Sequence, residues 1–272
     1  MNDPEKYAPV GVFDSGVGGL TVVREIMNLL PDEQVVYFGD TARVPYGSKS
    51  GETVTKFSRQ DVKFLLGMHV KAVVAACNTA SAVALDEIEK EISVPIIGVV
   101  RPGARAAAEA TRKKKVGVIA TEATIHSEIY TKYIQGIDSD TKVIGKACPL
   151  FVPLVEEGLL NDPVTDEIAR RYLGELKGTG IDTLILGCTH YPLLKDTIAR
   201  TMGEDVTLVN PAYETARSLK KLLTEKGLLN SSDTIAKHRF FVSDSVDKFL
   251  SFASAILPYE ITSAERINIE EY

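Results

Sequence analysis

The hydrophobic pattern of the chain alternates short apolar runs with longer amphipathic segments. The short runs are rich in β-branched residues, which favours buried strands, and they lie at residues 10–13, 35–38, 72–76, 95–99, 116–120, 142–147, 183–187 and 206–209. Segments with helical periodicity lie between many of them, at residues 51–67, 80–91 and 163–177. This alternation is typical of βαβ units, so we predict an α/β fold with mostly parallel sheets flanked by helices.

The two halves of the chain resemble each other. VGVFDS at residues 10–15 matches VGVIAT at residues 116–121, an offset of 106, and Cys77 matches Cys188 with an offset of 111. Each of the two cysteines directly follows a predicted strand. Two similar offsets for two separate elements indicate a duplicated α/β unit. We therefore predict two similar domains that are related by pseudo-symmetry and face each other across a cleft.

The predicted domains do not follow each other simply along the chain. We expect residues 99–210 to form the second domain. The segment after residue 210 contains another predicted strand, at residues 239–243, and we expect it to return to the first domain. The first domain would then be discontinuous and consist of residues 1–98 and 211–272.

Polar side chains follow several of the predicted strands in both halves. In open parallel sheets, ligands bind beyond the carboxyl ends of the strands. The polar residues at such ends are Asp14, Ser15, Asp40, Cys77, Asn78, Thr79, Thr121, Cys188, Thr189 and His190. We expect both domains to point these groups into one cleft, which is the candidate active site.

Composition and charge exclude several classes of protein. The chain has 31 Lys and Arg residues against 37 Asp and Glu residues, and apart from RKKK at residues 112–115 the basic residues are scattered. No face is therefore marked for nucleic acid. No apolar stretch approaches the roughly 20 residues of a membrane helix, and the start MNDPEKYAP lacks the apolar region of a signal peptide. We expect a cytoplasmic protein with no nucleic-acid or membrane partner.

The three cysteines are an odd number at wide spacing, which is not typical of a disulfide framework or a CxxC metal site. Free cysteine often packs as a small hydrophobic residue, and we interpret Cys148 in this way. Cys77 and Cys188 differ, because each is followed by hydrogen-bonding residues that a core would not favour. A reactive thiol needs a lowered pKa or a nearby base, and His190 and Asp14 are the candidates.

The glycine-rich segment FDSGVGG has neither the GxGxxG spacing nor the Lys-Ser or Lys-Thr ending of nucleotide-binding loops. We interpret it as a tight turn that exposes Asp14 and Ser15 and caps a helix beginning near Leu20. By composition alone, Glu156 and the PYG turn at residues 45–47 are ordinary turn residues.

Five motifs of the chain resemble those of the glutamate racemases, bacterial enzymes that interconvert L- and D-glutamate to supply cell-wall peptidoglycan. These motifs are GVFDSGVGGLTV, YFGDTARVPYG, AACNTASA, PLFVPLVEEG and LGCTHYPLL, in order between about residues 8 and 216. The pair of cysteine motifs is highly specific, whereas the stretch beyond about residue 230 is much less diagnostic. The resemblance implies an amino-acid racemase that needs neither pyridoxal phosphate nor a metal and whose partners are glutamate and a second copy of the chain in a homodimer.

The resemblance also implies a role for each matching residue. Cys77 would be the base toward D-glutamate and Cys188 the base toward L-glutamate. Asp14 and His190 would assist the thiols and also contact substrate, and Glu156 would support His190. The residues that would hold the side-chain carboxylate are Ser15, Tyr46 and Gly47, those for the α-carboxylate are Asn78, Thr79 and Thr189, and further pocket residues are Thr121 and Thr124.

The chemistry agrees with two thiols, because racemisation removes the Cα proton from one face and returns a proton to the other. One departure from the expected pattern is Ala123, which stands where a glycine is expected in a turn. Three alternatives remain open. Cys77, Cys188 and His190 could bind zinc, although no fourth ligand is evident; the substrate could be aspartate, a hydantoin or another compound; or the chain could be a binding protein without activity.

Overall fold

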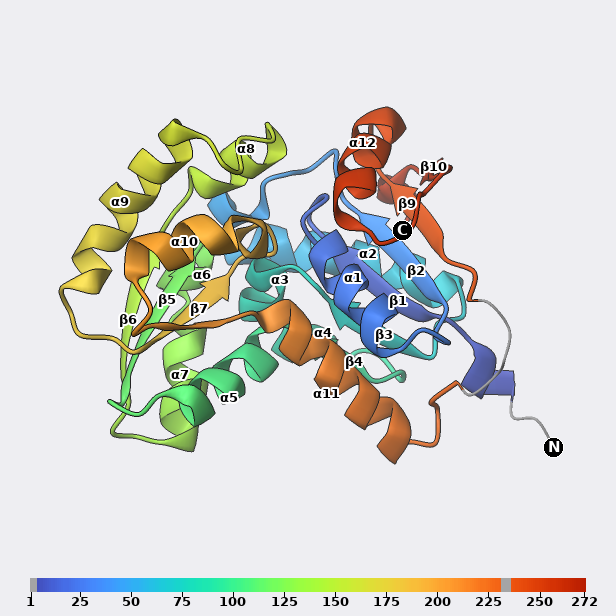
Figure 1. The fold of residues 1–272 in the computed structure, drawn as a ribbon. Helices are drawn as coiled ribbons and strands as arrows, with labels where there is room; N and C mark the ends of the chain where they lie inside the picture. The colour runs from blue at the N-terminus through green and yellow to red at the C-terminus, as the bar shows by residue number, and fades with distance from the viewer. Residues whose placement is uncertain (1–3, 231–235) are drawn as a thin grey trace.

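The computed structural model describes residues 4–230 and 236–272 and contains two parallel sheets with helices on both faces of each (Figure 1). The first sheet has the strand order β10-β9-β2-β1-β3-β4 and the second β6-β5-β7-β8. All these neighbouring strands pair in parallel, as predicted. The strands are β1 Val10–Asp14, β2 Val35–Gly39, β3 Ala72–Ala75, β4 Ile96–Gly98, β5 Lys115–Ala120, β6 Lys142–Ala147, β7 Thr183–Gly187, β8 Thr207–Val209, β9 Arg239–Val242 and β10 Glu265–Arg266.

The two sheets repeat one arrangement of strands. In the first sheet β1 lies between β2 and β3, with β4 beyond β3; in the second, β5 lies between β6 and β7, with β8 beyond β7. The strands of the two VGV motifs therefore hold equivalent positions, as do the strands that precede Cys77 and Cys188. This arrangement confirms the predicted fold class. We call each sheet with its helices a lobe; the first lobe lies on the right in Figure 1 and the second on the left.

The α-helices are α1 Leu20–Leu29, α2 Gly51–Gly67, α3 Asn78–Val83, α4 Leu85–Ile88, α5 Val100–Ala110, α6 Glu122–His126, α7 Ile129–Ile137, α8 Phe151–Glu156, α9 Pro163–Lys177, α10 Lys195–Met202, α11 Pro211–Glu225 and α12 Val246–Ile256. Short 3-10 turns are η1 Pro4–Tyr7, η2 Tyr46–Ser48, η3 Tyr191–Leu194 and η4 Ile269–Glu271. The predictions for α2 and α9 are confirmed. The single helix predicted at residues 80–91 is wrong, because the chain turns at Ala84 (φ −114°) and so brings Leu85 and Ile88 into the same core as Ala80.

Side chains of each central strand alternate between two hydrophobic cores. Val10 and Val12 of β1 contribute to the core that includes α1, α11 and α12, whereas Phe13 contributes to the core with α2, α3 and α4. In β5, Val118 and Ile119 divide in the same way between the two cores of the second lobe. Burial on both faces explains why these strands read as continuous apolar runs in the sequence.

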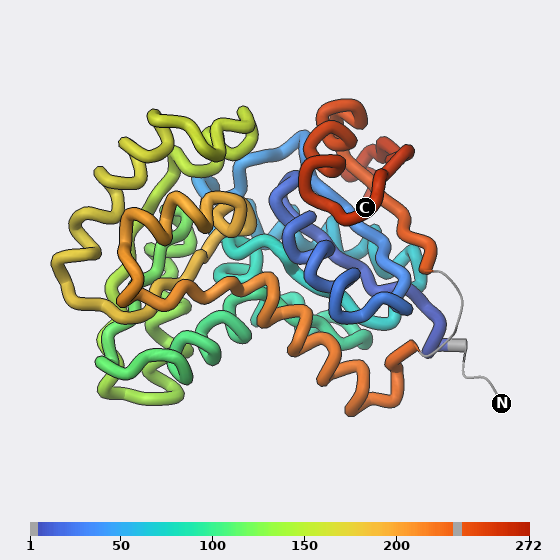
Figure 2. The backbone as a smooth tube through the Cα atoms, viewed as in Figure 1, coloured from blue at the N-terminus to red at the C-terminus, as the bar shows by residue number. Residues whose placement is uncertain are grey.

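The C-terminal part of the chain packs on the first lobe. Helix α11 contacts both α1 and α5; it starts near the junction of the lobes and runs along the lower side of the first lobe in Figures 1 and 2. It is capped by Asn210, whose side chain accepts a hydrogen bond from Ala212 N–H, and Pro211 occupies its first turn. Strand β9 then pairs with β2 at the edge of the first sheet. The domain boundaries near residues 98 and 210 stay a prediction.

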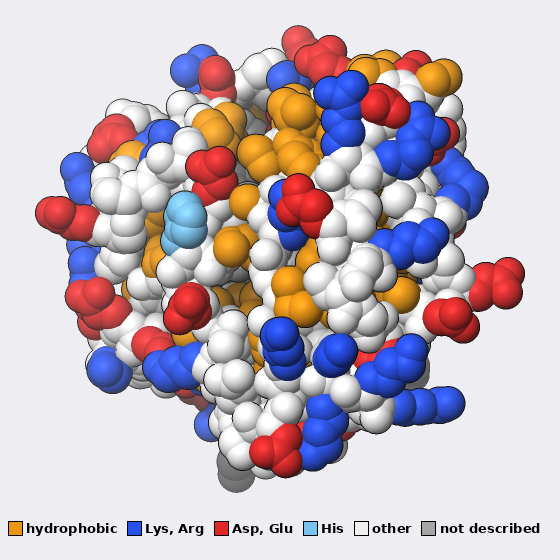
Figure 3. Space-filling view, turned by 90° about the vertical axis from the view of Figure 1, so that its left-hand side faces the viewer, with side chains coloured by type: hydrophobic (Ala, Val, Ile, Leu, Met, Phe, Trp, Pro, Cys, Tyr) orange, Lys and Arg blue, Asp and Glu red, His pale blue; other side chains and the backbone are white. Residues whose placement is uncertain are grey.

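The surface carries charges of both signs. Over the face shown in Figure 3, acidic and basic side chains are interspersed, and neither sign covers it continuously. The net charge of the whole chain is −6. Among the described residues, no helix combines the length and apolar character needed to cross a membrane.

Candidate active site

Cys77 and Cys188 hold equivalent positions in the two lobes and lie close to each other. Cys77 stands between β3 and α3, and Cys188 directly follows β7. Their side chains are buried, with 5% and 6% of each residue exposed. Burial, the charge of Asp14 and, more weakly, that of Cys188 raise the pKa of Cys77 to about 12. The repeat in the sequence thus brings two buried thiols into one region of the structure.

The thiol of Cys77 has two polar neighbours from the end of β1. Its Sγ lies 3.5 Å from Ser15 Oγ, and the carboxylate of Asp14 is close enough to affect its pKa. Asp14 Oδ2 accepts a hydrogen bond of 3.0 Å from Gly16 N–H, while Oδ1 is buried without a hydrogen-bond partner. Such a group costs free energy unless a ligand or water satisfies it.

The prediction that the glycine-rich turn exposes Asp14 is wrong. Asp14 is completely buried, and burial raises its pKa even though the charge of His190 and neighbouring N–H groups lower it. The turn passes directly over its side chain, because a Cβ at Gly19 would lie 2.4 Å from Asp14 Cβ. Gly19 is also the residue directly before α1. Because glycine has no side chain that could accept a hydrogen bond from the first turn, the helix has no side-chain cap.

The thiol of Cys188 is part of a chain of three ionisable groups. Its Sγ lies 3.8 Å from His190 Nδ1, and His190 Nε2 lies 3.1 Å from Glu156 Oε1 at the end of α8. Burial lowers the pKa of His190, but the hydrogen bonds to Cys188 and Glu156 outweigh it and raise that pKa to about 10. The hydrogen bond to His190 in turn lowers the pKa of Glu156. An imidazolium paired with the Glu156 carboxylate is therefore the favoured form.

Hydroxyl groups from the second lobe contact the start of α3 in the first lobe. Thr79 Oγ1 lies 3.0 Å from Thr121 Oγ1 and 3.4 Å from Thr124 Oγ1. Tyr130 of α7 donates a hydrogen bond of 2.7 Å to Asn78 Oδ1, which fixes the orientation of the amide. Sequence reasoning missed Tyr130, because a tyrosine within an amphipathic helix gives no signal of such a contact.

The glycine-rich turn also contacts the second cysteine motif. Thr21 Oγ1 donates to the backbone oxygen of Thr189 at 2.9 Å. A Cβ at Gly18 would lie 2.4 Å from Thr189 Oγ1 and 2.5 Å from His190 Nδ1, so only glycine allows this approach. Gly18 therefore brings the first lobe against the motif that follows Cys188.

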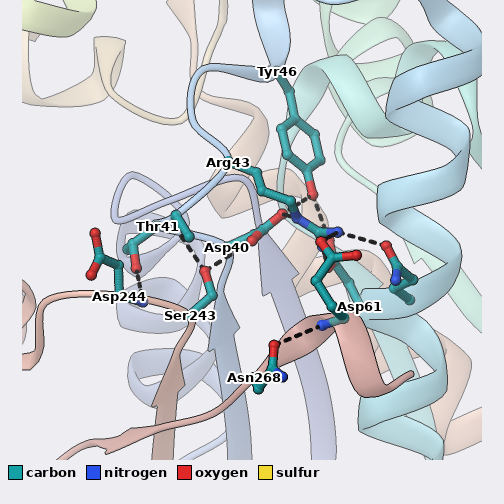
Figure 4. A network of polar contacts seen from close by, with 11 residues as sticks. Asp40, Thr41, Arg43, Tyr46, Asp61, Ser243, Asp244 and Asn268 are labelled. Atoms are coloured by element: carbon teal, nitrogen blue, oxygen red, sulfur yellow. Dashed lines mark hydrogen bonds and ion pairs between the residues drawn. The ribbon is translucent and has the colours of Figure 1, made fainter.

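Tyr46 and Gly47 begin the short turn η2 beside this arrangement. The Tyr46 hydroxyl lies 2.5 Å from Asp40 Oδ2 and 3.0 Å from Asp61 Oδ2 (Figure 4), so its side chain is already engaged. The backbone N–H groups of Tyr46 and Gly47 are the groups left for a ligand, because the first N–H groups of a helical turn have no partner within it. Asp40, which we expected in the cleft, belongs to this separate network instead.

The structure thus brings together the predicted residues from both halves of the chain. In the part of the chain that the structure describes, no three His, Cys, Asp or Glu side chains are arranged to hold a metal ion. The zinc alternative for Cys77, Cys188 and His190 therefore has no ligand set among those residues.

Comparisons with known proteins agree on one family. The family model for Asp/Glu/hydantoin racemases matches residues 13–219. A glutamate racemase of Geobacter metallireducens is 49% identical over 264 residues, which cover 97% of this chain and 98% of that protein. The structure of a Bacillus anthracis glutamate racemase has a TM-score of 0.92 at 45% identity, covering 96% of this chain and 98% of that one. The structure of the Francisella tularensis glutamate racemase in complex with D-glutamate has a TM-score of 0.92 at 40% identity, covering 98% and 100%. The chain therefore belongs to the Asp/Glu/hydantoin racemase family and, within it, to the glutamate racemases.

Proposed function

We propose that this racemase interconverts L- and D-glutamate by direct proton transfer between two cysteines, without a cofactor, and supplies D-glutamate for peptidoglycan synthesis. The observation that carries the mechanism is the burial of Cys77 and Cys188 at equivalent strand ends of the two lobes, each with its own acid/base neighbour. The choice of glutamate is supported by relatives that match nearly the whole chain.

The surroundings of the two thiols suit complementary roles. Cys188 would accept the Cα proton of L-glutamate, because it lies beside His190, whose raised pKa keeps a positive charge there and whose imidazolium is paired with Glu156. Cys77 would act as thiol, because burial and Asp14 raise its pKa to about 12. With L-glutamate, Cys188 takes the Cα proton and becomes a thiol, while Cys77 gives its proton to the opposite face and becomes a thiolate. The reverse transfers convert D-glutamate.

The carbanionic intermediate has negative charge that spreads into its α-carboxylate. Hydrogen bonds from Asn78, Thr79 and Thr189 would take up this charge, with Thr121 and Thr124 holding Thr79 in place. Asn78, Thr79 and Thr189 are almost entirely buried, and in a region that excludes water such hydrogen bonds stabilise charge more strongly than in solvent.

The side-chain carboxylate of glutamate would bind on the opposite side of the site. Ser15 Oγ is near Cys77, and the N–H groups of Tyr46 and Gly47 begin the turn η2. Three donors around one carboxylate form charge-assisted hydrogen bonds, which distinguish glutamate from a neutral side chain. The absence of a cofactor is proposed because neither cysteine motif contains a lysine that could form a Schiff base.

The proposal is tested by replacing each cysteine with serine, which preserves shape but is a much weaker acid and base. Cys77→Ser and Cys188→Ser should each lose racemisation almost completely while still binding glutamate. Cys148→Ser is the matched control, because Cys148 is a third buried thiol that contacts Lys146 O and takes no part in the proposed proton transfers. A near wild-type rate in either of the first two variants would contradict the mechanism.

Solvent isotope exchange tests the two-sided geometry directly. In D2O, newly formed product should carry deuterium at Cα from the start, whereas unreacted substrate should stay mostly protonated early in the reaction. A single base would instead return the abstracted proton or introduce deuterium into both pools together. The two enantiomers are separated by chiral chromatography, and the deuterium content at Cα of each is then measured by mass spectrometry.

Two further predictions concern the environment of the enzyme. We propose that it works in the cytoplasm, where the peptidoglycan precursors that need D-glutamate are assembled, and that it forms a homodimer. Sedimentation of the purified protein measures whether it forms a homodimer.

A further inference from the structure

A buried network of charged side chains lies beside the turn of Tyr46 and Gly47, and the proposed proton transfers do not use it (Figure 4). Asp40 and Asp61 are completely buried, and the side chain of Arg43 between them is 10% exposed. Buried charges cost free energy unless they are paired and hydrogen-bonded, so the geometry of such a cluster is tightly constrained.

Arg43 connects the loop after β2 to one face of α2. Its Nε donates to Asp40 Oδ2 at 2.6 Å, Nη2 donates to Asp61 Oδ1 at 3.2 Å, and Nη1 donates to Gln60 Oε1 at 2.6 Å. The guanidinium also lies 4.1 Å from the ring centroid of Phe57. Phe57, Gln60 and Asp61 are spaced i, i+3, i+4 and therefore share one face of the helix. A planar guanidinium can satisfy all these contacts, and a lysine could not.

Tyr46 joins this network from the substrate side. Its single hydroxyl proton can be donated to only one of the two carboxylates that it contacts, Asp40 at 2.5 Å and Asp61 at 3.0 Å. The second contact needs a proton on a carboxyl group. Asp40 also accepts hydrogen bonds from Arg43 and from Ser243 Oγ at 2.9 Å, so both of its oxygens act as acceptors and this proton is assigned to Asp61. Burial and the charge of Asp40 raise the pKa of Asp61 well above its usual range.

The turn is held on its other side by the second lobe. A Cβ at Gly47 would lie 2.6 Å from Thr121 Cβ, so the Gly47 backbone is in direct contact with Thr121. Thr121 in turn is within hydrogen-bonding distance of Thr79, on the α-carboxylate side of the site. The C-terminal segment supports the same loop, because Ala42 N–H donates to Ser243 Oγ at 2.9 Å. The network and Thr121 together fix the distance between the two ends of the substrate site.

We propose that Arg43 and Asp61 are positioning residues for the side-chain carboxylate of the substrate: through Tyr46, they hold the turn whose N–H groups bind that carboxylate. The inference rests on the proposed role of Tyr46 and Gly47. Neither positioning residue touches the reacting atoms. Contacts to the side-chain carboxylate are made equally in the ground state and the transition state, so their loss raises KM and leaves kcat nearly unchanged.

The first test compares Arg43→Met with Arg59→Met. Methionine keeps an aliphatic stem without the charge. Arg59 is the matched control, because it lies on α2 away from the face that contacts Arg43 and its ion pairs with Glu87 and Glu91 are exposed. Arg43→Met should raise KM for both enantiomers about tenfold, equivalent to about 1.4 kcal/mol, with kcat within about threefold of wild type. Arg59→Met should change both constants less than about twofold.

A second pair of variants answers the question if Arg43→Met does not fold. Asp61→Asn retains a donor toward Tyr46 and an acceptor for Arg43, so its KM should stay within about twofold of wild type, whereas Asp61→Leu removes both and should raise KM about tenfold. Thermal denaturation of each variant separates loss of folded protein from loss of affinity.

The outcomes for this inference and for the proposed function are distinct. Unchanged KM in Arg43→Met and Asp61→Leu, or a fall in kcat at constant KM, would overturn the positioning role. The proposed function is tested in the wild-type enzyme and its cysteine variants. If the wild-type enzyme and the cysteine variants give the expected results but KM is unchanged in Arg43→Met and Asp61→Leu, only the positioning role is refuted.

Discussion

Replacing Glu156 with glutamine tests whether Glu156 keeps His190, the neighbour of Cys188, in its charged form. The change preserves shape but removes the charge that accepts a hydrogen bond of 3.1 Å from His190. That contact contributes to the raised pKa of His190, about 10, so without it the pKa falls. In the proposed mechanism the imidazolium assists Cys188 as a base, and it is lost as the pH rises through the pKa of His190. The alkaline limb of activity should therefore move to lower pH in Glu156→Gln.

The magnitude follows from the geometry of the contact. A hydrogen bond to a charged group stabilises by about 1.5–3 kcal/mol, and we take the lower part of this range because a quarter of the Glu156 side chain is exposed. A loss of about 1.5–2 kcal/mol corresponds to a decrease of about 10- to 30-fold in kcat/KM and moves the alkaline limb by about 1 to 1.5 pH units. The decrease must be equal for both enantiomers, because their equilibrium constant in water is one.

Circular dichroism of glutamate provides the assay, with kcat/KM measured for each enantiomer between about pH 6 and pH 10. The substrate ammonium titrates in the same range for every variant, so only the difference from wild type is interpreted. Glu157→Gln is the matched control, because it removes a charge at the neighbouring, exposed position. If Glu156→Gln kept the wild-type alkaline limb and a kcat/KM within twofold, the proposed role of Glu156 would be refuted.

Three further predictions address the rest of the site. Gly18→Ala should decrease kcat/KM at least about tenfold in a folded protein, because the added Cβ would lie 2.4 Å from Thr189 Oγ1. Gly136→Ala is the control and should be neutral, because a Cβ at Gly136 would have no atom within 4 Å. Wild-type rates in Gly18→Ala would contradict the close contact. Tyr130→Phe removes the hydrogen bond to Asn78 Oδ1 and should lower kcat/KM by about 5- to 30-fold, as measured with both enantiomers; an unchanged value would show that the amide is oriented by other contacts. Glutamine should be a far poorer substrate than glutamate, and comparable kcat/KM values would remove the assignment of a carboxylate subsite.

Much of the fold could be predicted from the sequence, because strands buried on both faces are continuous apolar runs whose pattern is local. The runs that became β1, β3, β5 and β7 were all identified, and the two VGV motifs pointed to the duplication that the equal strand orders confirm. The sequence predicts the ends of helices less well. Local periodicity indicates one helix where the structure has α3 and α4, because it does not show the packing of Leu85 and Ile88 into a core formed by other elements.

For the candidate site, the sequence by itself supplied the residues with reactive or polar side chains, because their chemical types and their places after strands are local properties. Cys77, Cys188 and His190 could be singled out in this way, while their roles in catalysis stay predictions. The complete burial of Asp14, and the contact of Gly18 with the motif after Cys188, were decided only in three dimensions.

The same holds for Tyr130 and for the network around Arg43. Each forms a hydrogen bond with a residue that is distant in the sequence: Tyr130 lies 52 residues from Asn78, and Arg43 lies 18 residues from Asp61. Such contacts depend on how whole lobes and helices pack, and the free energy of a buried hydrogen bond or ion pair depends on burial that no sequence window contains. The sequence therefore determined which groups are available, and the tertiary structure decided their distances, their protonation and which of them hold the others in place.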